Sequence, residues 1–258
     1  MKKEFSVLFL TFVTVLASCQ SADELTKQAK TLWLNGSQAK AVPLYLKAAN
    51  RGNAEAQYMT GICYNEGIVF KKNDSIAGSW FLKSAEGGNT EAMERMSMIT
   101  ASNKDNYKKS FSWDLRCAEK MEPRCMGIVA RAYESGASGA EKNIDSMLIW
   151  LKKLALIDDR GVIETKGGAI VDARFKLGEL YRDGKYVPKD REKSYMWFLI
   201  YNENKTQIWL DKQEENIKVI REVEKKLYIA ERESAVSQAE ELLKRPLREL
   251  SHLYSSRN

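Results

Sequence analysis

The sequence predicts an all-α protein that is built from repeated helix pairs and ends in further helices. Proline is scarce, at 4 of 258 residues, and helix-forming Leu, Ala, Glu, Lys and Met are frequent. Residues 43–56 match residues 79–92 without a gap, so one unit recurs along the chain. Small residues also recur at fixed intervals before a tyrosine or a glycine, which indicates helices that approach each other closely.

The first 18 residues predict a signal peptide rather than part of the fold. A basic start precedes an apolar run over 5–17, and this run is shorter than the roughly 20 residues that a membrane-spanning helix needs. The run ends in Leu-Ala-Ser before Cys19, and small residues in front of a cysteine resemble the lipobox of bacterial lipoproteins. An ordinary signal peptide with an incidental cysteine is the alternative.

The lipobox resemblance implies a location in the cell envelope. Residues 1–18 would be removed, and Cys19 would carry the lipid that anchors the protein to a membrane. Gln20 follows the cysteine where an aspartate would favour the inner membrane, so the resemblance implies the periplasmic side of the outer membrane. Residues 19–36 would then form the lipidated N-terminus, a linker and a first helix.

Residues 37–202 contain the repeats. The two best-matched segments share these pairs: Leu46/Leu82, Lys47/Lys83, Ala49/Ala85, Gly52/Gly88, Asn53/Asn89, Glu55/Glu91 and Ala56/Ala92. The small residue, tyrosine and terminal glycine recur as Ala56, Gly61, Tyr64 and Gly67, as Cys125, Ala130, Tyr133 and Gly136, and as Ala173, Gly178, Tyr181 and Gly184. A degenerate copy has Ala92, Ser97 and Thr100 in these places.

Each unit therefore predicts a helix, a loop and a second helix. The small residues let the second helix approach the first, and a glycine ends the first helix. Asp74, Asp145 and Asp190 precede the second helices and are expected as N-caps or as first-turn acids. The tryptophans of the second helices, Trp80, Trp150 and Trp197, are expected to face the first helices. Because no unit can bury its apolar face alone, stacking of the units completes the core.

These residues resemble the Sel1-like repeat family, with Ala173, Gly178, Tyr181, Gly184 and Asp190 as the clearest copy. The resemblance implies a right-handed superhelical α/α solenoid of Sel1-like helix pairs, which are similar to tetratricopeptide repeats. The chain departs from the family pattern at Thr60, where leucine is usual, and in the 92–120 unit, which lacks its glycine and tyrosine. It also carries an insertion at 158–169.

Residues 203–258 predict a C-terminal helical cap. Apolar residues recur there at helical intervals, and the abundant Glu and Lys supply the polar outer face that a terminal unit needs. A coiled-coil dimerisation arm is the alternative, although no clean heptad runs through the segment.

The resemblance extends to two cysteines. A subgroup of secreted Sel1-like proteins joins adjacent helices through a cysteine pair with the spacing of Cys117 and Cys125, which implies a disulfide here. Two buried thiols are the alternative. Cys63 occupies an apolar position and is expected as a buried, unreactive thiol.

The sequence gives little support for catalysis. His252 is the single histidine, no nucleophile motif is present, and no glycine-rich stretch continues into a phosphate loop, so we expect no enzyme, no metal and no cofactor. The carboxylates Asp158 and Asp159 lie in the insertion beside Arg160 and are interpreted as part of a solvated loop. A net charge of +6 is weak evidence for nucleic acid, and we expect none.

The first helices of the units are expected to line a concave protein-binding face. The positions three and six past each small residue supply the candidate contacts, which are Met59, Ile62, Arg95, Met98, Ile128, Arg131, Lys176 and Glu179. They mix flexible apolar side chains with cations, which suits recognition of a protein, although packing between helices would explain the apolar members equally well. The 158–169 insertion is a second candidate surface.

These observations predict a lipid-anchored scaffold or adaptor that binds another protein in the bacterial cell envelope. An immunity lipoprotein that neutralises an antibacterial toxin is the alternative. A cell-wall enzyme is a third and weaker hypothesis.

Overall fold

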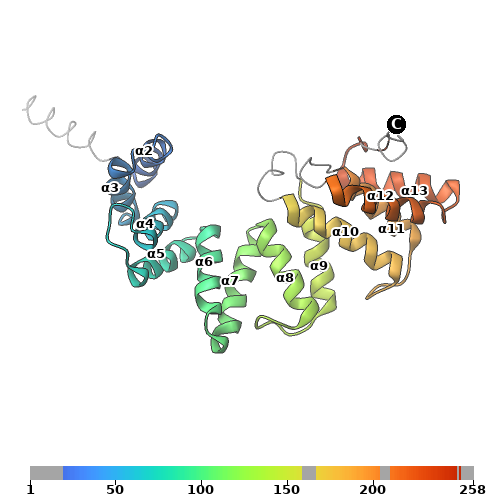
Figure 1. The fold of residues 1–258 in the computed structure, drawn as a ribbon, viewed down its shortest axis with the longest axis horizontal. Coiled ribbons are helices and arrows are strands. Elements are labelled where there is room, and N and C mark those ends of the chain that lie inside the picture. Colours follow the sequence, from blue (N-terminus) through green and yellow to red (C-terminus); the bar gives the residue numbers. More distant parts are fainter. Residues whose placement is uncertain (1–19, 159–166, 204–209, 249, 251–258) are drawn as a thin grey trace, which may run out of the picture. The chain divides into compact units, whose positions relative to one another are not determined.

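The computed structural model describes residues 20–158, 167–203, 210–248 and 250, so Cys19, Asp159 and His252 lie outside the described residues. The regular elements within these ranges are helical and include no strand, as the sequence predicts (Figure 1). In chain order they are α2 (Ala22–Leu34), α3 (Gln38–Ala49), α4 (Ala54–Glu66), α5 (Asp74–Glu86), α6 (Thr90–Ala101), the 3-10 turn η1 (Lys104–Asn106), α7 (Tyr107–Glu119), α8 (Pro123–Ser135), α9 (Ile144–Ala155), α10 (Gly167–Asp183), α11 (Arg191–Asn202), α12 (Leu210–Glu224) and α13 (Ile229–Leu243). None of these helices combines the length and the apolar character that spanning a membrane requires.

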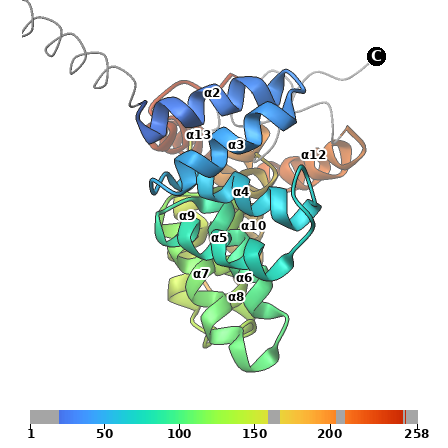
Figure 2. The same ribbon diagram turned by 90° about the vertical axis from the view of Figure 1, so that its left-hand side faces the viewer.

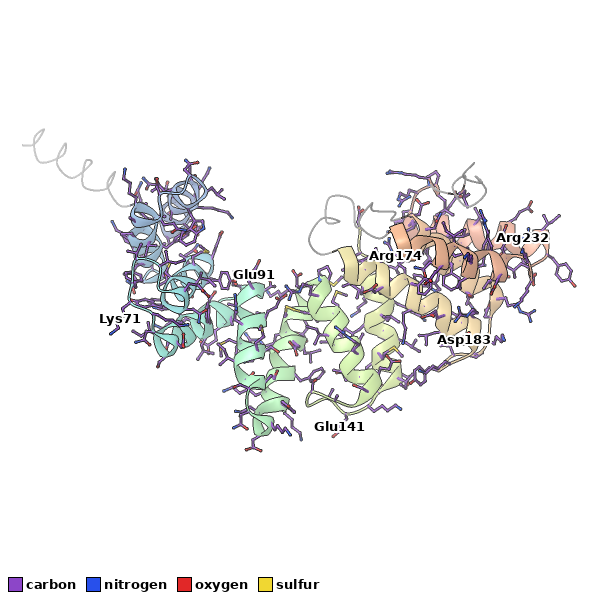
Figure 3. All side chains as sticks on the ribbon, in the orientation of Figure 1. Lys71, Glu91, Glu141, Arg174, Asp183 and Arg232 are labelled. Atoms are coloured by element: carbon purple, nitrogen blue, oxygen red, sulfur yellow. A yellow bond between two sulfur atoms is a disulfide. The ribbon has the colours of Figure 1, made fainter. Side chains whose placement is uncertain are left out.

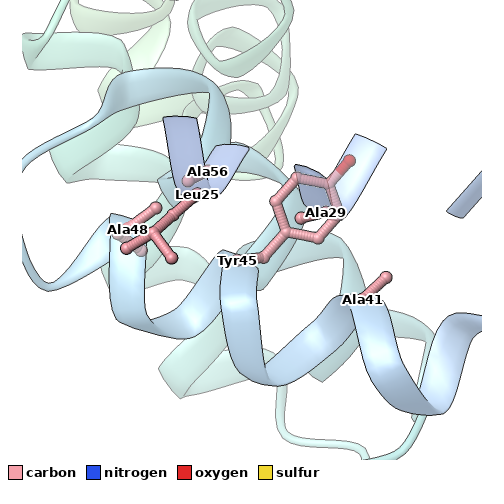
Figure 4. Packing of buried hydrophobic residues seen from close by; sticks show 7 residues of the cluster. Leu25, Ala29, Ala41, Tyr45, Ala48 and Ala56 are labelled. Atoms are coloured by element: carbon pink, nitrogen blue, oxygen red, sulfur yellow. The ribbon is translucent and has the colours of Figure 1, made fainter. Parts of the chain in front are cut away.

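The chain divides into two compact units, the first up to Trp113 and the second from Asp114 onward, so the boundary in the sequence falls within α7. In the first unit each helix packs against the next along the chain, and Figure 2 shows α2, α3 and α4 in succession. A cluster of small and large apolar side chains joins these three helices (Figure 4). Its members are Leu25, Ala29, Ala41, Tyr45, Ala48, Ala49 and Ala56.

Polar side chains begin the helices at equivalent places. Asn73, Asn143 and Asp190 are the N-caps of α5, α9 and α11, and each side chain accepts a hydrogen bond from a backbone N–H in the first turn. Asp190 thus has the predicted role of N-cap, whereas Asp74 and Asp145 follow asparagine caps and lie in the first turn, where they favour the helix dipole.

In two pairs, α4 with α5 and α10 with α11, the helices meet at a glycine, and the ring that meets it belongs to the residue after the tryptophan. A Cβ atom at Gly61 would lie 2.6 Å from Cε1 of Phe81, and one at Gly178 would lie 2.5 Å from Cε1 of Phe198. The predicted tryptophan of each second helix, Trp80 or Trp197, directly precedes this phenylalanine. Trp80 instead packs, half-buried, against the apolar cluster of α2, α3 and α4.

A second recurring contact joins successive helix pairs. Gln57 Nε2 donates to the carbonyl of Ala49 at 3.2 Å, and Arg174 Nε donates to the carbonyl of Ala155 at 2.7 Å. Each donor directly follows the small residue of its unit, and each acceptor is the last residue of the preceding helix. Arg174, labelled on α10 in Figure 3, is fully buried and also donates to the carbonyl of Ile157 at 3.2 Å.

The second unit ends in two helices that cover α11. Most of α11 is buried, with α10 and α13 as its main neighbours and α12 as a further one. Glu203 at the end of α11 accepts a hydrogen bond from Arg245 Nη1 at 2.6 Å and two from the backbone N–H of Arg248. The Glu203 carboxylate thus fastens the segment after α13 to the end of the repeats.

Candidate functional site

The second unit contains a groove with a volume of about 890 Å³. Helices α8 and α10, the first helices of two adjacent pairs, form its long walls, and α9 lies between them. The end of α11 and the middle of α12 complete the lining. Every lining residue belongs to the second unit, so the groove is a feature of that unit alone.

The floor of the groove is apolar. Met147, Leu151 and Leu154 of α9 are nearly or fully buried beneath it. They are reached between small residues on the two walls, because Gly127 of α8 and Ala169 of α10 have little or no side chain. A Cβ atom at Gly127 would lie 3.7 Å from a methyl carbon of Leu154, at ordinary van der Waals distance.

The rim of the groove is charged, and most of its charges pair within the unit. Lys176 Nζ lies 3.2 Å from Glu134 Oε1 and so joins α10 to α8, while Lys185 approaches the same oxygen at 4.0 Å. Glu179 lies 3.5 Å from the guanidinium of Arg182. These pairs are partly exposed, so we assign them the modest stabilisation of surface ion pairs.

Aromatic rings close the groove at one end. Phe175 packs edge-on against Tyr201, with 5.0 Å between ring centroids, and at 5.2 Å against Phe198 behind it. Asn216 of α12 donates to the hydroxyl of Tyr201 at 2.6 Å. Burial raises the pKa of Tyr201, while the Asn216 hydrogen bond acts in the opposite direction, so the phenol stays protonated and holds α12 against the repeats.

A disulfide fixes the start of one wall. Cys117 at the end of α7 is bonded to Cys125 in the first turn of α8, with 5.7 Å between their Cα atoms. The structure therefore contains the expected pairing. Cys125 follows Arg124, the first groove residue of α8, so the bond restricts movement of that wall.

Four of the eight predicted contact residues line this groove together. Ile128 and Arg131 come from α8, and Lys176 and Glu179 come from α10. The positions three and six past the small residue therefore lie close together in the second unit.

The other four predicted contacts lie in the first unit. Met59 and Ile62 belong to α4, and Arg95 and Met98 belong to α6. Met59 is partly buried against the apolar cluster of α2, α3 and α4, so packing explains it, whereas Met98 is 65% exposed. Of the 158–169 insertion, Gly168 and Ala169 line the groove, and residues 159–166 lie outside the described residues.

Sequence reasoning missed several groove residues. Gly127 and Asp172 lie on the same helix faces as the predicted contacts, one turn earlier, and the 3.6-residue period would have found them had it been extended. Asn216 and Ile217 carried no such signal, because they belong to α12, outside the repeats, and reach the groove through tertiary packing.

Comparisons with known proteins agree with this architecture. The Sel1 repeat model matches residues 35–53, 54–89 and 171–200. Among curated proteins, chitin synthase regulatory factor 2 of Schizosaccharomyces pombe is 26% identical over 170 residues, which make up 63% of this chain and 32% of that protein. This chain thus spans about a third of the length of that relative.

Two solved structures share the fold. A protective antigen of uropathogenic Escherichia coli with an SLR fold superposes with a TM-score of 0.63 at 24% identity, covering 88% of this chain and 46% of the antigen. A Sel1 repeat protein from Oxalobacter formigenes superposes with a TM-score of 0.58 at 21% identity, covering 85% of this chain and 87% of that one.

Proposed function

We propose that this chain, in which the Sel1 repeat model matches three segments, is a non-catalytic scaffold that binds another protein in the groove between α8 and α10. The observation that carries the proposal is the construction of the groove. Two adjacent repeats place an apolar floor beneath a charged rim, which is the arrangement that recognises an apolar side chain with polar neighbours.

The lining of the groove supports binding rather than catalysis. Among the described residues that line it there is no serine, threonine, cysteine or histidine, so it offers no serine-type or cysteine-type nucleophile with an imidazole base. Its rim carboxylates Glu134 and Glu179 form ion pairs with Lys176 and Arg182, so both already have partners within the protein.

The proposal extends to an envelope location, which rests on the sequence around Cys19. The apolar run over 5–17 and the small residues before Cys19 support lipid attachment at that cysteine. We expect labelling with an alkyne fatty acid in the native bacterium to mark the protein and to be lost in the Cys19→Ala variant. Equal labelling of both forms would exclude Cys19 as the lipid site.

Photocrosslinking tests the groove directly. A benzophenone amino acid at Ile128, inside the groove, is expected to capture a defined partner in the native bacterium. The same group at Ile149 serves as the matched control, because Ile149 is 53% exposed on α9 and does not line the groove. Equal capture at both positions would contradict the groove as the binding site.

A glycine substitution tests whether filling the groove blocks binding. Gly127→Leu adds a side chain at the floor and also raises helix propensity, so a loss of partner cannot be attributed to a weaker helix. Gly78→Leu is the matched control, since Gly78 is also helical and a Cβ there meets nothing within 4 Å. We expect about tenfold weaker binding for the first variant and no change for the second, by the cost of displacing one anchoring side chain.

The identity of the captured partner separates the two binding hypotheses. A set of envelope proteins would support the scaffold role. A single toxin that binds tightly and one to one, and whose toxicity is relieved by this protein, would support the immunity role instead.

A further inference from the structure

One cation that lines the groove, Arg131, has no ion pair among the described residues. Arg131 lies on the α8 wall and is exposed. Glu134, one turn further along α8, is engaged by Lys176 and Lys185 rather than by Arg131. Among the described residues, no carboxylate oxygen lies within 4 Å of the Arg131 guanidinium.

The other charged residues of the groove, Arg124 and Asp172 among them, already have interactions within the protein. Lys176 faces Glu134, and Glu179 faces Arg182. A bound cation would have to displace one of these intramolecular pairs, whereas a bound carboxylate can reach Arg131 without displacing any. Arginine also matches a carboxylate through two parallel hydrogen bonds, so the complementary group is an acid.

The apolar floor lies close to this cation along the same helix. Gly127, which opens the floor, precedes Arg131 by four residues, so both positions lie on one face of α8 about one turn apart. A partner that fills the floor beside Gly127 would bring a neighbouring side chain of its own to Arg131. Because Arg131 itself is exposed, this ion pair contributes mainly to the choice of partner side chain rather than to the bulk of the affinity.

Resting on the proposed function, we infer that the groove recognises an acidic, apolar peptide segment. A large aliphatic or aromatic side chain of the segment enters the floor between Gly127 and Leu154. An aspartate or glutamate at its helical neighbour position, three or four residues away, pairs with Arg131.

Peptide display on the full-length protein tests this inference without knowledge of the natural partner. A library of random twelve-residue peptides is selected on the wild-type protein, and the enriched peptides are measured by fluorescence anisotropy. We expect enriched peptides to carry Asp or Glu three or four residues from Leu, Phe, Trp or Ile. Arg131→Glu should weaken their binding about tenfold, because the charge reversal replaces attraction to the peptide's acid by repulsion.

Two controls show whether a loss of binding comes from the lost ion pair with Arg131 or from another effect of the substitution. Arg191→Glu makes the same charge change at an exposed arginine of α11 outside the groove, and it should leave binding unchanged. Replacing the peptide's acid by lysine should restore binding to Arg131→Glu, because the ion pair is then reversed. That restoration would not occur if the substitution had merely unfolded the unit.

Failure of this inference is distinct from failure of the proposed function. Peptides that lose binding with Gly127→Leu but not with Arg131→Glu would leave the groove as a binding site and overturn its acidic specificity. Peptides indifferent to both substitutions would overturn the groove itself. A selection that enriches nothing would overturn recognition of a short segment.

Discussion

Helices α4 and α5 of the first unit and α10 and α11 of the second are two copies of one repeat, and they differ in informative places. Both join their helices through a glycine and a phenylalanine, Gly61 with Phe81 and Gly178 with Phe198. However, α10 has 17 residues where α4 has 13, and the additional turn at its start includes Gly168 and Ala169 of the groove.

The comparison separates the residues that build the repeat from those that give it a binding surface. The glycine and the phenylalanine fix how closely two helices pack, and the repeat pattern preserves them. The groove-facing positions of α10 are set by none of these packing requirements, which leaves them available for recognition. In the first unit the corresponding position of α4, Met59, packs instead against α2 and α3.

The most direct way to break the shared contact is to remove the rings. Phe81→Ala and Phe198→Ala should each lower the free energy of unfolding of their unit by about 4 kcal/mol, because each leaves a cavity beside its glycine. Urea unfolding followed by hydrogen exchange of each unit measures the two effects. A loss below about 1 kcal/mol at either site would show that this copy does not depend on the glycine–phenylalanine contact.

The hydrogen bonds of Gln57 and Arg174 to the preceding helix occupy equivalent positions, but we expect them to differ in how much they stabilise the two copies. Arg174→Met should cost about 3 kcal/mol, because it removes charged hydrogen bonds to the buried carbonyl of Ala155 and to the partly buried carbonyl of Ile157. Gln57→Met should change stability by less than about 1 kcal/mol. Although it removes one hydrogen bond to Ala49, it also removes the Gln57 Oε1 atom, which is buried without a hydrogen-bond partner among the described residues.

Thermal unfolding of the two variants checks this contrast, with Arg174→Lys as a further control. Lysine keeps the charge but cannot reach two carbonyl groups with one planar fork, so only part of the stability should return. Equal losses of stability for Arg174→Met and Gln57→Met would mean that burial of the side chain, and not its hydrogen bonds, determines how much each residue stabilises the protein.

The sequence predicted the helix pairs well because their determinants are local. Asparagine and aspartate caps, helix-ending glycines such as Gly67 and Gly184, and small residues at fixed spacing act within one or two turns. The sequence did not identify Phe81 and Phe198 as the rings beside the glycines, because each follows a tryptophan directly and only tertiary packing shows which of the two rings meets the glycine. The contribution of α12 to the groove depends on how the cap folds back, which no local pattern encodes.

The second unit contains a disulfide, whereas Cys63, the cysteine among the described residues of the first unit, is a free thiol. Reducing the bond between Cys117 and Cys125 should lower the stability of the second unit by about 2–3 kcal/mol, because the unfolded chain gains freedom.

In a Cys19→Ser background, the reactivity of the Cys63 thiol can be compared with that of the disulfide cysteines. Burial raises its pKa to about 11, above the ordinary 9.0, so it stays protonated at pH 8 and should react slowly.

Alkylation before and after reduction measures both expectations. Native protein at pH 8 should take up no label, unfolded protein one label at Cys63, and reduced unfolded protein two more. Labelling of three thiols in unfolded, unreduced protein would exclude the disulfide. Fast labelling of Cys63 in native protein would contradict its burial.

The smallest expected effect concerns the loops that follow the first helices in the two copies. Val69 and Tyr186, each two residues after the helix-ending glycine, adopt φ angles of +64° and +67°, which side-chain-bearing residues rarely adopt. Val69→Gly and Tyr186→Gly should therefore each raise stability, by at most about 1 kcal/mol, since the added freedom of glycine in the unfolded chain offsets part of the relieved strain. Because valine is branched at Cβ, Val69 should gain more than Tyr186, and the difference in melting temperature between the two variants is the measurement. A larger gain at Tyr186 would instead indicate that the contact between its ring and Lys185 adds little to the stability of the loop.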